Sequence, residues 1–184
     1  MARHAQLLRR EDTALVVVDV QEAFRGVVEA FDAVVARTRT LIEGARRLAV
    51  PVVVTEQYPK GLGRTAAEVA AVLPEGFEPV EKTAFSSCGA QAFIPRLRGA
   101  HQVLLCGIEA HVCVNQTAHD LLARGYQVHV LTDCVSSRAE QNRRVGLDKM
   151  FRSGALPSST ELALFELMRD ARHEQFRAIQ KLIK

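Results

Sequence analysis

Residues 102–133, QVLLCGIEAHVCVNQTAHDLLARGYQVHVLTD, contain the pattern that decides the fold. Two apolar runs, at 102–108 and 127–133, flank a segment whose apolar residues recur on one face of a helix. Arg124 and Gly125 give this helix a basic last turn and a stop. The first run is continuous rather than alternating, which is typical of strands covered on both faces, as in parallel sheets. The stretch therefore predicts one strand–helix–strand unit of an α/β protein.

The same alternation of strand and helix extends in both directions along the chain. Further buried strands are predicted at 14–19, 51–57 and 78–85, with a weaker candidate at 154–160. Helical patterns lie between and after them, at 31–49, 66–73, 138–152, 160–169 and 173–184. Such alternation specifies right-handed crossovers and a doubly wound sheet. Because no linker-like change of composition occurs, we expect residues 1–184 to form a single domain.

The overall composition is that of a soluble globular protein. Of the 184 residues, 48% are hydrophobic and 24% are charged, and the net charge is +3. This charge is too small and too evenly spread to favour nucleic acid as a partner. No apolar stretch approaches the roughly 18–20 residues that a membrane-spanning helix needs. We therefore expect a small-molecule substrate and neither a nucleic-acid nor a membrane partner.

The N-terminus and the cysteines indicate the compartment. Residues 1–13, MARHAQLLRREDT, carry early positive charge without an apolar region or cleavage site, so we expect a flexible arm rather than a secretory signal. None of the four cysteines forms a CxxC pair, and with the six histidines they give no zinc-like spacing. We therefore expect a cytoplasmic protein with no disulfide framework, no metal and no cofactor.

Chemically useful side chains are predicted at the carboxyl ends of the strands, where ligands bind to sheets of this kind. The first strand closes at Asp19, the third delivers Lys82, and the fourth leads to Cys113. Each has an ordinary explanation on its own: Asp19 as a turn cap, Lys82 as a solvated surface charge, and Cys113 as a buried packing residue. Their shared position at one edge of the sheet favours a functional site.

The three side chains together suggest nucleophilic catalysis. A thiol has an ordinary pKa of about 8.5 and attacks only after losing its proton. A helix N-terminus would lower the pKa of Cys113, Asp19 could accept its proton, and Lys82 could hold both anions in place. Backbone N–H groups around Cys113 could then face a substrate oxyanion. This set predicts acyl transfer through a thioester.

Three segments resemble, in order and at the usual spacing, the signature blocks of the isochorismatase-like cysteine hydrolases. They are VVVDVQEAF (16–24), EKTAFSS (81–87) and GIEAHVCVNQTAHDLLARGYQVHVLTDCVSSR (107–138), and the resemblance spans nearly the whole chain. It implies a three-layer α/β/α Rossmann-like sandwich with a six-stranded parallel sheet. It also implies a catalytic triad of Asp19, Lys82 and Cys113. A cis peptide bond between Ile108 and Glu109 is implied too, with the backbone N–H groups of Glu109 and Cys113 as the oxyanion hole.

Two departures from the family pattern narrow the expected reaction. Nicotinamidase-like members carry an Asp-x-His metal site after the second strand, where this chain has TEQYP (55–59), so we expect neither that metal nor that activity. Members that cleave the vinyl ether of isochorismate lack a cysteine at the nucleophile position, so Cys113 favours hydrolysis of a C–N bond. The stretch TEQYPKGLGRT (55–65) resembles the isochorismatase-domain-containing subgroup. The predicted function is a cysteine hydrolase of a small amide-like substrate; the alternative is a catalytically silent interaction or regulatory module that keeps the fold.

Two further expectations concern the surroundings of the site and the assembly. Four residues near the strand ends are candidates for substrate binding, the aromatic ones being either pocket wall or core: Gln21, Phe24, Tyr58 and Phe85. The family likeness and the apolar face of the last helix suggest a homo-oligomer, a dimer or larger. That face, Phe176, Ile179 and Ile183, could equally pack on its own domain.

Overall fold

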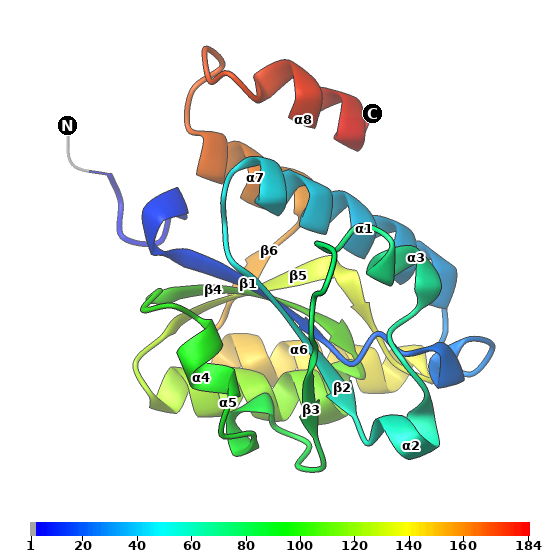
Figure 1. Ribbon diagram of the computed structural model, residues 1–184. Coiled ribbons are helices and arrows are strands. Elements are labelled where there is room, and N and C mark those ends of the chain that lie inside the picture. The colour runs from blue at the N-terminus through cyan, green and yellow to red at the C-terminus, as the bar shows by residue number, and fades with distance from the viewer. Residues whose placement is uncertain (1–2) are drawn as a thin grey trace.

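A six-stranded parallel sheet forms the centre of the computed structural model, which describes residues 3–184 (Figure 1). The strands are β1 (Thr13–Val18), β2 (Val52–Gln57), β3 (Val80–Lys82), β4 (Gln102–Ile108), β5 (Gln127–Ser136) and β6 (Leu156–Ser158). Their order across the sheet is β3-β2-β1-β4-β5-β6, and every neighbouring pair is parallel. All residues of β1 and β4 are buried, because these central strands are covered on both faces. The predicted parallel sheet is confirmed.

Helices cover both faces of the sheet. Figure 1 shows α1 (Phe31–Arg47), α3 (Ala67–Ala70), α7 (Thr160–Met168) and α8 (Phe176–Ile183) on one side. On the other side lie α4 (Phe93–Arg96), α5 (Asn115–Ala123) and α6 (Glu140–Arg152), and α2 (Pro59–Leu62) follows β2. Helix α1 forms because its buried residues recur at helical spacing from Phe31 to Ala45 and bury one face against the sheet. The three-layer α/β/α architecture is therefore confirmed.

The order of the strands reverses between β1 and β4. From β1 the chain builds outward through β2 to β3, then returns to add β4 on the other side of β1. Val18, the last residue of β1, pairs with Gly107 near the end of β4. The segments that follow these two strands therefore start side by side, at the crevice where ligands bind in open α/β sheets.

Several predicted elements are shorter than expected. The strand expected at 78–85 covers only Val80–Lys82, and the helix expected at 66–73 is the single turn α3. The one-turn helices α2 and α4 were not predicted, because one turn is too short to show a periodic pattern. One π-helical turn, η4 (Ala110–Val114), joins β4 to α5.

The expected flexible N-terminal arm is wrong from Leu8 onward. Leu8 is fully buried, and its backbone N–H donates to the Glu166 carboxylate at 3.0 Å. The N–H of Arg9 donates to the side-chain oxygen of Gln102 at 2.7 Å. These contacts fix the segment beside the start of β4; Met1 and Ala2 lie outside the described residues.

Helix α8 packs on its own domain, which was one of the two expectations for it. Ile179 is fully buried, while Phe176 and Ile183 are half-buried against the core. The ring of Phe176 meets that of Phe165 on α7 edge to face, with centroids 6.2 Å apart. The apolar face of α8 is therefore covered within the chain. Among residues 3–184, no helix combines the length and the apolar character that crossing a membrane requires.

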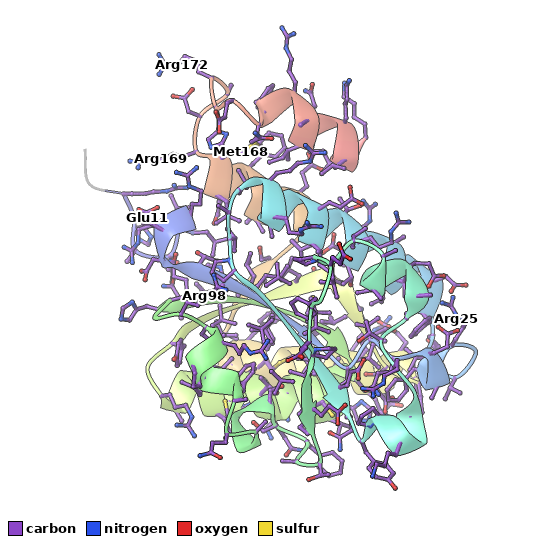
Figure 2. The ribbon with its side chains drawn as sticks, in the orientation of Figure 1. Glu11, Arg25, Arg98, Met168, Arg169 and Arg172 are labelled. Carbon is purple, nitrogen blue, oxygen red and sulfur yellow. The ribbon has the colours of Figure 1, made fainter. Side chains whose placement is uncertain are left out.

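The loop after β1 is fastened by Arg25, which Figure 2 labels at the edge opposite Glu11 and Arg98. The Arg25 guanidinium donates to Glu22 in the loop, to Asp32 on α1 and to Glu68 on α3. It also lies over the ring of Phe31, 5.1 Å from the centroid. These contacts tie the loop that begins at Asp19 to the helical layer, and so help to fix one side of the site.

Candidate active site

Asp19 lies directly after β1 and is fully buried. Its backbone has a positive φ of 51°, a conformation that aspartate tolerates better than most residues. One carboxylate oxygen, Oδ1, accepts a hydrogen bond from the Thr55 hydroxyl at 2.6 Å. The other, Oδ2, accepts from Lys82 Nζ at 2.6 Å. A buried carboxylate is thus held in one orientation and balanced by one cation.

Lys82 ends the edge strand β3, and its side chain is 1% exposed. Besides Asp19, its Nζ donates to Gln57 Oε1 at 2.8 Å and to the Phe85 carbonyl at 3.0 Å. The Ala84 carbonyl lies 3.3 Å away. An ammonium group has three N–H donors, so protein oxygens can accept all of them. The hydrogen bonds compensate for the loss of water that a buried charge suffers.

Cys113 lies in the π-helical turn η4 and is 7% exposed. Burial raises the pKa of its thiol to about 12, with the Asp19 carboxylate raising it further and the Lys82 ammonium lowering it. The structure therefore brings the three predicted residues together. The pKa is therefore raised and not lowered as expected, because burial and the Asp19 carboxylate together exceed the opposing effect of Lys82. At neutral pH the resting sulfur carries its proton beside a carboxylate.

The segment from Ile108 to Cys113 has the backbone geometry that the resemblance implied. The Ile108–Glu109 peptide bond is cis. The Glu109 side chain is buried and accepts from the backbone N–H and from Nε of Arg138, at 2.9 and 3.1 Å. His111 Nδ1 lies 3.0 Å from the Ser137 hydroxyl. Contacts with the segment after β5 therefore hold the turn that carries Cys113.

Two glycines allow this turn to approach its neighbours. Gly107 has a φ of +121°, and a Cβ there would lie 2.0 Å from the carbonyl oxygen of Val18. Gly146 on α6 packs under the turn, where a Cβ would lie 2.8 Å from the carbonyl oxygen of Ala110. Both contacts are with backbone, which cannot move aside as a flexible side chain can. The sequence therefore needs glycine at both positions to bring β1, η4 and α6 together.

Gln21 and Phe24, two of the residues predicted to bind substrate, are both engaged in contacts within the protein. The fully buried Gln21 donates through Nε2 to the carbonyls of Gln57 and Gly63, at 3.1 and 2.7 Å, and accepts from the Gln57 N–H at 2.7 Å. Both N–H groups of its amide donate to backbone carbonyls, so Gln21 links the end of β2 to the loop that contains Gly63. Phe24 is half-buried and packs against the core.

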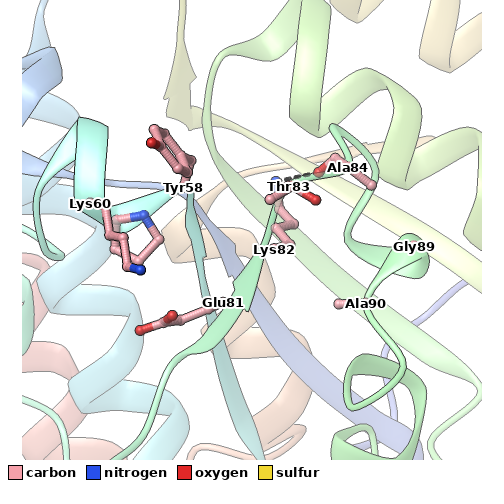
Figure 3. Close-up of a pocket in the computed structure, with 9 residues that line it drawn as sticks. Tyr58, Lys60, Glu81, Lys82, Thr83, Ala84, Gly89 and Ala90 are labelled. Atoms are coloured by element: carbon pink, nitrogen blue, oxygen red, sulfur yellow. Dashed lines mark hydrogen bonds between the residues drawn. The ribbon is translucent and has the colours of Figure 1, made fainter.

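Tyr58 lines a cavity of about 440 Å³ at the outer edge of β3 (Figure 3). The cavity walls are residues 58–60, 81–84, 89 and 90. Of the three predicted catalytic residues, only Lys82 is part of this wall. Phe85 is 54% exposed and contributes its carbonyl to Lys82. Within residues 3–184, no three His, Cys, Asp or Glu side chains are grouped so that they could hold a metal ion.

Sequence reasoning missed Thr55 and Gln57, which contact Asp19 and Lys82 directly. Both residues stand near the end of the predicted strand at 51–57, at the same sheet edge as Asp19. That position was the available signal. The role of an uncharged side chain such as Gln57 becomes evident only from the pairing of β2 with β3, which places it beside Lys82.

Comparison with known proteins identifies close relatives. Residues 13–161 match the model of the isochorismatase domain. The chain is 45% identical over 177 residues to mouse isochorismatase domain-containing protein 2A, covering 95% of this chain and 84% of that one. A solved structure described as MAR1 ribonuclease from Caenorhabditis elegans has a TM-score of 0.92 and 40% identity, covering 96% of this chain and 92% of the other. The Escherichia coli YcaC gene product, described as an octameric hydrolase of unknown specificity, shares the fold with a TM-score of 0.89 at 23% identity, covering 100% and 91% of the two chains.

Proposed function

The chain belongs to the isochorismatase family, and from this premise we propose that it is a cysteine hydrolase that cleaves the C–N bond of a small amide-like substrate. The observation that supports this most directly is the buried ion pair of Asp19 and Lys82, whose charges both act on the Cys113 thiol. A buried carboxylate beside a protonated thiol provides a base and a nucleophile within one site.

In the first half of the reaction, Cys113 Sγ attacks the substrate carbonyl carbon and passes its proton to Asp19. The C–S bond forms as the carbonyl π electrons move to oxygen, and the backbone N–H groups of Glu109 and Cys113 stabilise that oxyanion. When the carbonyl re-forms, the C–N bond breaks and the departing nitrogen takes the proton from Asp19. The product of this half is a thioester on Cys113.

In the second half, water attacks the thioester carbonyl. Asp19 accepts a proton from the water, and the C–S bond breaks as the carbonyl re-forms. The sulfur takes the proton back from Asp19, which restores the thiol and releases a carboxylic acid. Lys82 balances the charge of Asp19 in both halves. Since the thiol pKa is about 12, the proton transfer accompanies the attack and no thiolate is needed beforehand.

The cavity beside Lys82 gives a candidate place for the substrate. Tyr58 offers an aromatic wall there, and the exposed ring of Phe85 extends the same loop region. The scissile carbonyl must reach Cys113, which does not line this cavity, so the cavity can hold only the part of the substrate remote from the bond that breaks. We also propose that the protein acts in the cytoplasm as a homo-oligomer, a dimer or larger. Light scattering would measure the size of this assembly.

The test is a panel of small amides, ureas and carbamates, assayed for released amine or ammonia with three proteins. The wild type should turn over at least one compound, and Cys113→Ala should lose at least about 10³-fold in kcat/KM. Cys88→Ala is the matched control, because this half-buried cysteine lies on the loop after β3, and it should keep wild-type activity. Circular dichroism should show the same fold in all three.

Two outcomes would contradict the proposal. Undiminished turnover by Cys113→Ala would exclude the thiol as nucleophile. No turnover of any compound, and no acyl-enzyme detected by mass spectrometry, would favour the silent-module alternative. Because one relative is described as a ribonuclease, an RNA oligonucleotide belongs in the panel. RNA cleavage that survives Cys113→Ala would point to a different activity.

A further inference from the structure

Gln57, the last residue of β2, contacts Lys82 through an amide whose orientation is determined by its partners. Its Oε1 accepts from Lys82 Nζ at 2.8 Å, and its Nε2 donates to the Thr83 carbonyl at 2.7 Å. The reversed amide would point N–H groups at an ammonium and an oxygen at a carbonyl, so only one orientation is compatible with both partners. The parallel pairing of β2 with β3 sets Gln57 opposite Lys82.

The backbone of Gln57 is fixed in turn by the loop that carries Asp19. The Gln21 side chain accepts from the Gln57 N–H at 2.7 Å and donates to its carbonyl at 3.1 Å. The backbone N–H of Gln21 donates to the Asp19 carbonyl at 2.8 Å. A closed ring of hydrogen bonds therefore links Asp19, Lys82, Gln57 and Gln21.

The hydrogen bonds of Lys82 leave no donor for a substrate. Its three N–H groups match the three shortest contacts, to Asp19 at 2.6 Å, Gln57 at 2.8 Å and the Phe85 carbonyl at 3.0 Å. A lysine used in this way acts as a fixed charge and not as a proton donor. Removing one acceptor would free one N–H and let the ammonium group turn away from Asp19.

We propose that Gln57 is a positioning residue of the hydrolytic site, which holds the Lys82 ammonium against Asp19 and beside Cys113. This inference rests on the proposed function. It means that one uncharged side chain, Gln57, keeps the ammonium group of Lys82 in position. It also explains why Gln21 and Gln57 lie together at the end of the sheet. The Gln21 side chain fixes the backbone of Gln57, and the Gln57 side chain fixes Lys82.

The test measures how fast iodoacetamide alkylates Cys113, by peptide mass spectrometry at several pH values. Gln57→Met removes the acceptor with little change in size, so Lys82 should favour the Cys113 thiolate less. Alkylation of Cys113 should then slow by about tenfold at each pH below 10. Gln57→Glu adds a negative charge that competes for Lys82 and should slow it at least as much. Where a substrate is known, kcat should fall with little change in KM.

The controls separate this role from a general loosening of the site. Cys88 in the same protein is an internal standard, and its alkylation rate should not change. Gln127→Met, the same change in a half-buried glutamine at the start of β5, should leave Cys113 unaffected. A general loosening of the site would expose Cys113 and speed its alkylation, whereas loss of the positioning role should slow it.

Unchanged or faster alkylation of Cys113 in both Gln57 variants would overturn the proposal. If Cys113→Ala abolishes turnover while the Gln57 variants behave as the wild type, the cysteine hydrolase stands and only the positioning role fails. If Cys113→Ala keeps its turnover, the proposed function fails whatever the Gln57 variants do.

Discussion

Asp19 and Lys82 form an ion pair whose side chains are 0% and 1% exposed. Removing two charges from water is costly, and a buried pair often contributes little net stability compared with apolar residues of the same size. Here Thr55 and Gln57 supply additional hydrogen bonds that satisfy the pair. The cost of burying these charges is easier to understand if they act on a third group, and the nearby group whose pKa they perturb is the Cys113 thiol.

Asp19→Asn should change alkylation and turnover in opposite directions. The Asp19 carboxylate raises the pKa of the Cys113 thiol, so removing its charge should lower that pKa and speed alkylation by iodoacetamide. The same variant lacks the proposed base and should lose turnover by at least about 10²-fold.

In the wild type, a thiol pKa of about 12 means that the alkylation rate of Cys113 should keep rising from pH 8 to 11. A plateau near pH 9 would contradict the protonated resting thiol.

The three candidate catalytic residues could be predicted from the sequence because each follows or ends a strand of a parallel sheet. The pKa of Cys113 could not, because it depends on how deeply the π-helical turn buries the sulfur and on the distance to a carboxylate from another strand. Gln57 was missed for a related reason. The position of Gln57 near a strand end was its one signal in the sequence, and its contact with Lys82 follows only from the pairing of β2 with β3.

At the scale of elements, the meeting of β1 with β4 determines the geometry of the site. Gly107→Ala should destabilise the protein by several kcal/mol, because it combines an unfavourable φ of +121° with a Cβ placed 2.0 Å from the Val18 carbonyl oxygen. Gly154→Ala is the matched control: its φ is +105°, but nothing lies within 4 Å of its Cβ, so only the backbone cost of about 1–2 kcal/mol applies. Urea unfolding of both variants measures the difference. Equal losses would mean that β1 moves to make room for the extra methyl group.

The core strands were predictable because continuous apolar runs are a strong signal, whereas the ends of the elements depend on contacts across the sheet. Strand β5 was expected to end at Asp133 but continues to Ser136. Its pairing with β4 shifts register between Leu105 and Gly107, which leaves extra residues on β5. Arg143 on α6 donates to the carbonyls of this irregular segment, at 3.0 Å to Val135 and 2.5 Å to Thr132. No local pattern in the sequence indicates such a distant partner.

For the whole molecule, buried ionisable groups limit stability on both sides of neutral pH. Burial raises the pKa of all four thiols: Cys88, Cys106, Cys113 and Cys134. In alkaline solution the unfolded chain therefore releases thiol protons that the folded chain retains, so stability falls as the pH rises above about 8.5. On the acid side, the buried His129 on β5 lowers stability as the pH falls, because its ring stays neutral in the folded chain while the unfolded chain takes up a proton.

Stability should fall between pH 7 and pH 5 in the wild type, and less so in His129→Gln. Burial lowers the pKa of His129 to about 4, against about 6.5 when unfolded. Between these values the unfolded chain binds a proton that the folded chain does not, so lowering the pH from 7 to 5 should cost up to about 2 kcal/mol at this site. Glutamine does not titrate and keeps an amide that can reach Gln127, the hydrogen-bond partner of the ring at 3.2 Å. Urea unfolding at the two pH values measures the loss, with the exposed His101→Gln as the matched control. If both variants lose as much stability as the wild type, the acid sensitivity arises at the carboxylates, and the burial of His129 has no part in it.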